Sequence, residues 1–319
     1  MTRDEPWTSD IGHRTPTVKK TIKPPALKTG DTIGIAAPAG PVDSRDFKRH
    51  LSVLETSGFH VRTGPHLYDR KAYLAGDDAA RLSDLHALFK DKGVQAVFCA
   101  RGGYGTMRLL SGIDYDLILD NPKILVGYSD VTALLSAIFK KTGLTVFHGP
   151  MVQGFADKNE TTRSHLFQLL SSDCTTVNGD GQTRTLFPGK AAGRLMGGNL
   201  TLLCHLSGTP YFPDLEQSLL FIEDRGESLY RIDRMLTHLG LSGRLEQISG
   251  LIAGRFEQCG DAEAIDQLLK DRLAHLNIPV LTGFPSGHGQ DNLAWPLGIN
   301  AELDAVRKTI KLLEPCVSP

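Results

Sequence analysis

The spacing of hydrophobic residues changes regularly along the first half of the chain and predicts alternating strands and helices. A first strand followed by a turn is predicted at residues 31–40, and further strands at 59–62, 94–100, 124–126 and 143–148. The short apolar run at 124–126 is of the kind that a buried parallel strand needs. Apolar residues at steps of three and four predict amphipathic helices at residues 44–54, 77–90 and 131–138. This alternation favours an open parallel sheet flanked by helices.

The second half alternates in the same way after a polar connecting segment at residues 157–189, in which one helix is predicted at 161–170. Further helices are predicted at residues 200–206, 230–239 and 264–275, and strands at 218–222, 251–254 and 279–284. Residues 293–298 and 309–313 are expected to be the closing strands of this half. The predicted class is α/β, with an N-terminal open parallel sheet and a smaller mixed α/β domain. We expect a disordered leader at 1–25, domains at 26–152 and 190–319, and a linker at 153–189.

Composition narrows the classes of protein that the chain can represent. A length of 319 residues fits two domains. The net charge of −1 offers no basic excess for nucleic acid or an anionic membrane. No apolar run approaches the ~20 residues that a membrane span needs. We therefore expect neither nucleic acid nor a membrane as a partner.

Cysteine usage points to a reducing compartment. The five cysteines are odd in number, and none forms a C-x-x-C pair, so neither a disulfide framework nor a zinc site is expected. Residues 1–25 lack the apolar core of a secretory signal. The expected location is the cytoplasm.

One stretch carries candidate chemistry, because a buried strand passes within four residues into a helix. Ser129 lies in this turn, where a serine is lifted out at the end of the strand, as in a nucleophile elbow. The motif reads G-x-S-x-V, with Val131 in place of the usual second glycine. The alternative is that Ser129 only caps the following helix, since serine is a favoured N-cap residue.

A glycine-rich turn, residues 101–105, follows the strand at 94–100. Free backbone N–H groups in such a turn can hold a phosphate, a carboxylate or an oxyanion. The alternative is a tight turn that needs a positive φ. Arg101 favours an anionic ligand. The turn after the first strand lacks G-x-G-x-x-G, so no dinucleotide cofactor, and no Rossmann-type oxidoreductase, is expected.

The second half supplies an acid and a histidine at predicted strand ends. Glu223 follows a fully apolar run, so its buried carboxylate needs a partner, either Arg225 or a histidine. His288 lies between two glycines in a loop after a strand, outside any apolar stripe. Ser129, Glu223 and His288 therefore suit a nucleophile, an orienting acid and a base, in a site between the two domains.

These residues stand within motifs that resemble the LD-carboxypeptidase family of serine peptidases, over most of the chain from about residue 26. The motifs are Gly127-Tyr-Ser-Asp-Val-Thr132, Arg101-Gly-Gly-Tyr-Gly105, Phe147-His-Gly-Pro-Met151, Gly193-Arg-Leu-Met-Gly-Gly-Asn-Leu200, Phe221-Ile-Glu-Asp224, Tyr230-Arg-Ile-Asp-Arg-Met-Leu236 and Gly287-His-Gly289. One departure is Ala191-Ala192, where family members often carry an acid.

The resemblance implies that Ser129 is the nucleophile, His288 the general base and Glu223 its orienter. The backbone N–H groups of Gly103 and Asp130 would form the oxyanion hole. It also implies a homodimer that uses no metal or other cofactor. The implied reaction releases the terminal D-alanine of murein tetrapeptides from an L-centre, meso-diaminopimelate or lysine, during cell-wall recycling.

A free D-amino-acid carboxylate needs a cationic or N–H-rich partner. Arg101, Gly102 and Arg225 are the candidate substrate contacts, although both arginines could instead form structural ion pairs. The family also contains microcin C immunity peptidases, which act on nucleotide conjugates and resemble this chain except for a longer loop after the triad glutamate. A non-catalytic murein-peptide binding protein is the alternative of another class, but no triad residue is missing.

Overall fold

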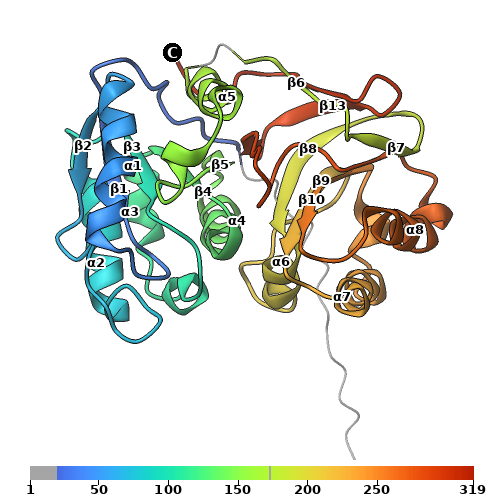
Figure 1. The fold of residues 1–319 in the computed structure, drawn as a ribbon, viewed down its shortest axis with the longest axis horizontal. Helices are drawn as coiled ribbons and strands as arrows, with labels where there is room; N and C mark the ends of the chain where they lie inside the picture. Colours follow the sequence, from blue (N-terminus) through green and yellow to red (C-terminus); the bar gives the residue numbers. More distant parts are fainter. Residues whose placement is uncertain (1–19, 172–173) are drawn as a thin grey trace, which may run out of the picture.

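The chain forms two α/β halves that lie side by side, each built around its own sheet (Figure 1). This computed structural model describes residues 20–171 and 174–319. The α/β class with two sheets agrees with the prediction from the sequence.

The first sheet has six strands in the order β12-β5-β4-β3-β1-β2, and only β12 runs antiparallel to its neighbour. Its strands are β1 (Thr32–Ala36), β2 (His60–Thr63), β3 (Ala96–Cys99), β4 (Ile124–Gly127), β5 (Val146–His148) and β12 (Trp295–Leu297). The helices of this half are α1 (Ser44–Thr56), α2 (Asp78–Lys90), α3 (Tyr115–Asp120), α4 (Thr132–Thr142) and α5 (Glu160–Leu170), with short 3-10 turns η1 (Thr106–Leu109), η2 (Ser129–Val131) and η3 (Phe155–Asp157). Because the strands are parallel, the turns after β3, β4 and β5 meet at one edge.

The second sheet has eight strands in the order β6-β14-β13-β8-β9-β10-β11-β7, of which β8 to β11 are parallel. Its strands are β6 (Thr176–Asn178), β7 (Arg184–Phe187), β8 (Lys190–Asn199), β9 (Ser218–Arg225), β10 (Gly250–Glu257), β11 (Val280–Thr282), β13 (Asn300–Asp304) and β14 (Thr309–Leu312). The helical elements are α6 (Leu200–Leu206), α7 (Leu229–Leu241) and α8 (Ala262–Leu273), with η4 (Leu245–Gln247) and η5 (Ala274–Leu276).

Three expectations about chain organisation differ from the structure. Residues 293–298, expected to close the second half, instead give β12 to the first sheet, where β12 pairs with β5. Pro296 suits this place, because an edge strand can accept a residue without an N–H group. The expected linker also contributes β6 and β7, which form the two edges of the second sheet and lack a long apolar run.

The predicted leader is the third difference. Residues 20–25 are bound to the folded chain, since Ile22 N–H donates to Gly143 O at 2.8 Å and Pro25 bridges to Ser318. Residues 1–19 lie outside the described residues.

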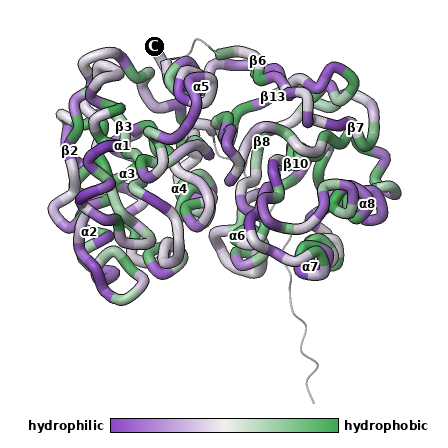
Figure 2. The backbone as a smooth tube through the Cα atoms, in the orientation of Figure 1, coloured by the Kyte–Doolittle hydropathy of each residue, from purple (hydrophilic) through white to green (hydrophobic). Residues whose placement is uncertain are grey.

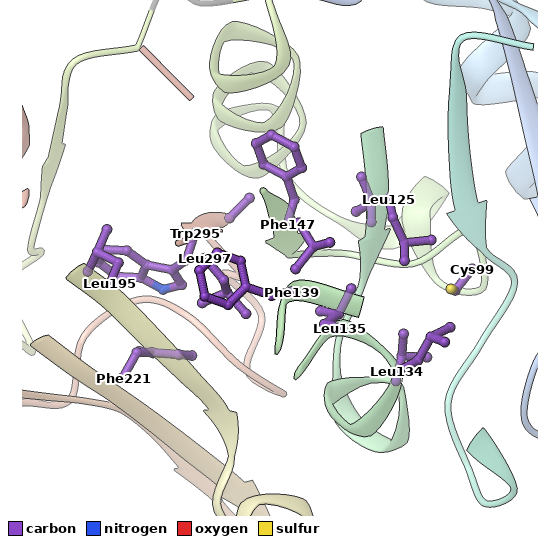
Figure 3. Close-up of a cluster of buried hydrophobic side chains, with 14 of the residues drawn as sticks. Cys99, Leu125, Leu134, Leu135, Phe139, Phe147, Leu195, Phe221, Trp295 and Leu297 are labelled. Carbon is purple, nitrogen blue, oxygen red and sulfur yellow. The ribbon is translucent and has the colours of Figure 1, made fainter. Parts of the chain in front are cut away.

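A continuous apolar core joins the two halves. Figure 3 shows buried side chains from β3, β4 and α4 lying beside those of β8, β9 and β12. The Trp295 ring lies 5.3 Å from Phe221 and 5.1 Å from Phe284, measured between ring centroids. Outer helices such as α8 carry many hydrophilic residues (Figure 2). This packing fixes the ends of the two sheets against each other.

Candidate active site

Ser129 lies in the tight turn between β4 and α4. Its φ is +61°, a left-handed conformation that is unfavourable for a residue with a Cβ atom. Gly127 permits the turn, because a Cβ there would lie 2.5 Å from the Val131 side chain. A serine held in such a strained strand-to-helix turn has the geometry of a nucleophile elbow.

The capping alternative for Ser129 finds no support in the hydrogen bonds. Neither η2 nor α4 has a side-chain capping hydrogen bond at its N-terminus. The Ser129 hydroxyl makes no hydrogen bond within residues 20–171 and 174–319, and Ser129 instead lines a cavity.

The buried acid has a histidine as its partner. Glu223 lies near the end of β9 and is fully buried. Its Oε2 lies 2.6 Å from His288 Nδ1, while the Arg225 side chain makes no ion pair within the described ranges. Of the two partners that the sequence left open for Glu223, the structure therefore has the histidine. This contact leaves His288 Nε2 for proton transfer.

The cavity that holds Ser129 and His288 has a volume of about 490 Å³. Its walls are Arg101, Gly102, Gly103, Tyr128, Ser129, Met151, Gln153, Arg225 and His288. No hydrogen bond joins Ser129 to His288 among the described residues, and such catalytic contacts often tighten only when substrate binds.

The glycine-rich turn lies directly against Ser129. A Cβ at Gly102 would lie 3.1 Å from Ser129 Oγ, a tight contact that the glycine avoids. Gly103 has a φ of +118°. The backbone N–H groups of Gly103 and Asp130 have no acceptor among the described residues, as an oxyanion hole requires. The Asp130 carboxylate accepts the Thr106 N–H at 2.9 Å, which ties the two turns together.

The two arginines of the cavity are not neutralised by carboxylates in the described chain. Arg101 Nη1 donates to Pro41 O at 3.1 Å and makes no ion pair there. The exposed Arg225 side chain has no hydrogen bond or ion pair within the same residues. The cavity therefore offers two cations to an anionic ligand.

The two halves of the chain each match a known domain. The model of the LD-carboxypeptidase N-terminal domain matches residues 33–149, and that of the LD-carboxypeptidase C-terminal domain matches residues 192–303. The chain belongs to the LD-carboxypeptidase family. It is a serine carboxypeptidase by this membership and by its named relatives.

Three relatives illustrate the range of this family. The "Probable murein peptide carboxypeptidase" of Bacillus subtilis is 42% identical over 296 residues, which cover 90% of this chain and 93% of that protein. The muramoyltetrapeptide carboxypeptidase from Oxalobacter formigenes has a crystal structure with a TM-score of 0.79 at 33% identity, covering 88% and 97% of the two chains. The microcin C7 self-immunity protein MccF of Escherichia coli is 30% identical over 330 residues, covering 92% and 96%. The structure of MccF in complex with glutamyl sulfamoyl guanosine has a TM-score of 0.87 at 27% identity, covering 93% and 99%.

In this LD-carboxypeptidase, the loop that carries His288 is anchored to the first half. Lys158 Nζ donates to Gly289 O at 2.7 Å, and the Asn292 N–H donates to Thr162 Oγ1 at 3.3 Å. Burial lowers the pKa of Lys158. The loop of His288 is therefore held by the half of the molecule that contains Ser129.

Gly287 leaves the space in which Glu223 contacts His288. Its φ is +112°, and a Cβ there would lie 2.8 Å from Glu223 Oε2. Gly287→Ala is expected to lower turnover by about 100-fold, because a small displacement of a catalytic group has effects of this order. The matched control is Gly30→Ala, which has a φ of +89° with nothing within 4 Å of the added Cβ. Equal turnover of both variants would contradict this role.

His148 is a buried histidine that the sequence analysis did not single out. It ends β5, and its ring lies 4.9 Å from Phe221 and 5.9 Å from Tyr128, between centroids. Neither ring nitrogen has a partner among the described residues. Burial, with a smaller effect of His288, lowers the pKa of His148 to about 3. His148 is therefore neutral at physiological pH.

This neutral histidine predicts a loss of stability in acid. Between pH 6.5 and 3 the unfolded chain binds a proton at His148 that the folded protein does not. The free energy of unfolding should therefore fall as pH falls below 6.5, by up to about 1.4 kcal/mol per pH unit. His148→Phe should flatten this slope in denaturant titrations, whereas His60→Gln, at an exposed histidine, should not. An unchanged slope in His148→Phe would contradict the account.

Sequence reasoning missed Asn199, Asp224 and Thr132 as supports of the site. All three are buried, and they connect Glu223 to the helix after Ser129. The feature of the sequence that could have identified these three residues is their place inside the motifs of the LD-carboxypeptidase family. Ala191 and Ala192, the departure from those motifs, pair with Leu303 and Glu302 of β13, away from the triad.

Within residues 20–171 and 174–319, no group of three or more His, Cys, Asp or Glu side chains could hold a metal ion. In the same ranges, no helix has the length and apolar character needed to cross a membrane. All five cysteines are free thiols.

Proposed function

We propose that this protein hydrolyses the bond between the L-centre of meso-diaminopimelate or lysine and the terminal D-alanine of murein tetrapeptides. The observation that carries the proposal is the pairing of Glu223 with His288 at 2.6 Å beside a strained serine in the same cavity. The names of two relatives, the murein peptide carboxypeptidase and the muramoyltetrapeptide carboxypeptidase, suggest the substrate.

The reaction follows from the roles of these groups. Ser129 Oγ attacks the carbonyl carbon of the L-centre, and its proton passes to His288 Nε2. Glu223 stabilises the resulting imidazolium through Nδ1. The N–H groups of Gly103 and Asp130 receive the oxyanion. His288 then protonates the leaving D-alanine amine, and a water molecule hydrolyses the acyl-enzyme by the same steps.

The terminal carboxylate of the substrate is proposed to bind Arg101 and Arg225, beside the backbone of Gly102. Arg101→Met and Arg225→Met are expected to raise KM for the tetrapeptide about 10- to 100-fold, because each removes a charge-assisted hydrogen bond. For a substrate that ends in D-alaninamide, which lacks the carboxylate charge, KM of the two variants should differ little from that of wild type. Arg45→Met, whose side chain is 93% exposed, is the control. Equal effects on both substrates would contradict binding of the carboxylate.

A second candidate function is hydrolysis of an aminoacyl nucleotide conjugate, favoured by the likeness to MccF in complex with glutamyl sulfamoyl guanosine. The connection after the acid argues for the smaller peptide substrate. β9 ends at Arg225 and α7 begins at Leu229, so three residues connect them. This connection has no room for an inserted aromatic loop over a base.

The experiment compares D-alanine release from L-Ala-γ-D-Glu-meso-diaminopimelyl-D-Ala with cleavage of glutamyl sulfamoyl adenosine, both with EDTA present. The proposal predicts D-alanine release that EDTA does not change. Cleavage of the nucleotide conjugate alone would favour the second function. Binding of the tetrapeptide without cleavage would favour a non-catalytic binding protein.

We also propose that the protein acts in the cytoplasm, in cell-wall recycling, as a homodimer. Five free thiols suit a reducing compartment. Sedimentation velocity at micromolar concentration tests the dimer, and a single species of monomer mass would contradict it.

A further inference from the structure

A buried polar contact joins the two halves directly behind the reacting groups. Asn199 ends β8 and is 4% exposed, and its backbone N–H donates to Thr132 Oγ1 at 3.0 Å. Thr132 is the first residue of α4, is fully buried and lies three residues after Ser129. This hydrogen bond therefore connects the second sheet to the helix that follows the nucleophile.

The same residue holds the acid. Asn199 lies opposite Glu223 in the parallel register of β8 and β9. Its Nδ2 group donates to Glu223 Oε1 at 3.3 Å and to Asp224 Oδ1 at 2.9 Å. Because the amide engages Oε1, the other carboxylate oxygen of Glu223 is the one directed at His288.

Asp224 explains why an amide is needed at this position. Burial raises the pKa of Asp224, and the nearby Glu223 carboxylate raises it further, against the opposing effect of its hydrogen bonds. Its partners are the Thr201 N–H and hydroxyl and the Arg225 N–H, besides Asn199. Two neighbouring buried carboxylates repel each other, and a shared N–H donor offsets this repulsion.

A glycine allows the two halves to approach this closely. Gly198 has a φ of +141°, and a Cβ there would lie 2.7 Å from Thr132 Oγ1. A side chain at this position would therefore displace α4 from β8.

We propose that Asn199 and Thr132 are positioning residues that fix the acid-bearing sheet against the nucleophile helix. Through them Glu223 and His288 keep their alignment with Ser129, although neither Asn199 nor Thr132 lines the cavity. The inference rests on the serine mechanism proposed above. It explains how a triad divided between two sheets is held in register.

Variants of Thr132 test the main-chain contact. Thr132→Val keeps the side-chain shape but leaves the Asn199 N–H without an acceptor, whereas Thr132→Ser keeps the hydroxyl. The matched control is Thr142→Val at the other end of α4, where the lost hydroxyl bonds Ile138 O at 2.6 Å and Leu144 N–H at 3.0 Å. Thr132→Val is expected to lower kcat about 10- to 100-fold with little change in KM. Thr132→Ser and Thr142→Val should stay near wild type per folded molecule.

The Asn199→Asp variant tests the contact to the acid. Aspartate keeps the cap to the Leu202 N–H but replaces the donor with a negative charge. The groups that face His288 or line its cavity are Glu223 from β9, Tyr128 beside the nucleophile, His148 from β5, Arg101 and Arg225. The carboxylate of Asn199→Asp adds a negative charge near His288, which makes His288 bind a proton more readily. The acid side of the kcat/KM profile of this variant should therefore move to higher pH, by about one unit.

A readout that needs no peptide separates this inference from the proposed substrate. The rate at which a fluorophosphonate probe modifies Ser129 should fall in Thr132→Val and Asn199→Asp in the same proportion as kcat. If wild type reacts with the probe but releases no D-alanine, the proposed substrate is wrong. The probe rates of the variants then still test whether Asn199 and Thr132 position the triad. Probe rates in both variants equal to that of Thr142→Val, with an unchanged pH profile, would overturn the inference.

Discussion

Ser129→Ala is expected to lower D-alanine release by about 10⁴-fold or more, because the residual activity rests on binding and the oxyanion hole alone. The effect should appear in kcat, with KM little changed. The strained backbone at Ser129 and its unbonded hydroxyl lead to this expectation, since the hydroxyl serves no other described contact. Measurement of kcat and KM for the tetrapeptide tests this expected loss. The variant is prepared separately, so that no trace of wild-type enzyme contributes activity.

Ser136→Ala provides the matched control for the nucleophile. Ser136 is a buried serine in α4, 2% exposed, in the helix that follows Ser129. Its replacement should leave kcat and KM unchanged. Activity of Ser129→Ala close to that of Ser136→Ala would mean that another group attacks the substrate.

Glu223→Gln is expected to have the second largest effect, a loss of about 10⁴-fold in kcat. The amide has nearly the same shape, but it carries no charge to stabilise the imidazolium formed in both chemical steps. It can also present its NH2 group to His288 and favour the wrong tautomer. Glu223 Oε1 accepts a hydrogen bond from Asn199 Nδ2 at 3.3 Å, and the amide oxygen of the new glutamine can accept the same hydrogen bond.

A control for this variant is Glu302→Gln, at a half-buried glutamate of β13. Thermal unfolding of both variants shows whether the mutant proteins are folded at the assay temperature. A folded Glu223→Gln protein with kcat within tenfold of wild type would remove Glu223 from the mechanism.

The spacing of apolar residues was sufficient to predict the strands of the first sheet. Strands such as β3 and β4 are buried on both faces, so their sequences are continuous apolar runs. The strands β6 and β7 escaped prediction because edge strands carry mixed, partly exposed residues. The placement of β12 in the first sheet depends on a pairing with β5, distant in the chain, that no local pattern encodes.

The candidate site could likewise be predicted only where a local sequence pattern identifies a residue. Ser129 could be found from its strand-to-helix turn, and His288 from its glycine-flanked loop. The sequence could not decide between Arg225 and His288 as partners of Glu223, because the choice depends on how the two halves pack. Asn199 was missed for a related reason, since its contact with the acid follows from the register of β8 against β9.

The most direct test of the central claim is detection of a tripeptidyl ester on Ser129. A substrate with D-lactate in place of the terminal D-alanine acylates faster than the peptide, so the acyl-enzyme should accumulate. We predict a burst of D-lactate release and, after acid quenching, the mass of the tripeptide acyl group on the proteolytic fragment that contains Ser129. Turnover of this ester without a burst, or an adduct on another residue, would contradict the account.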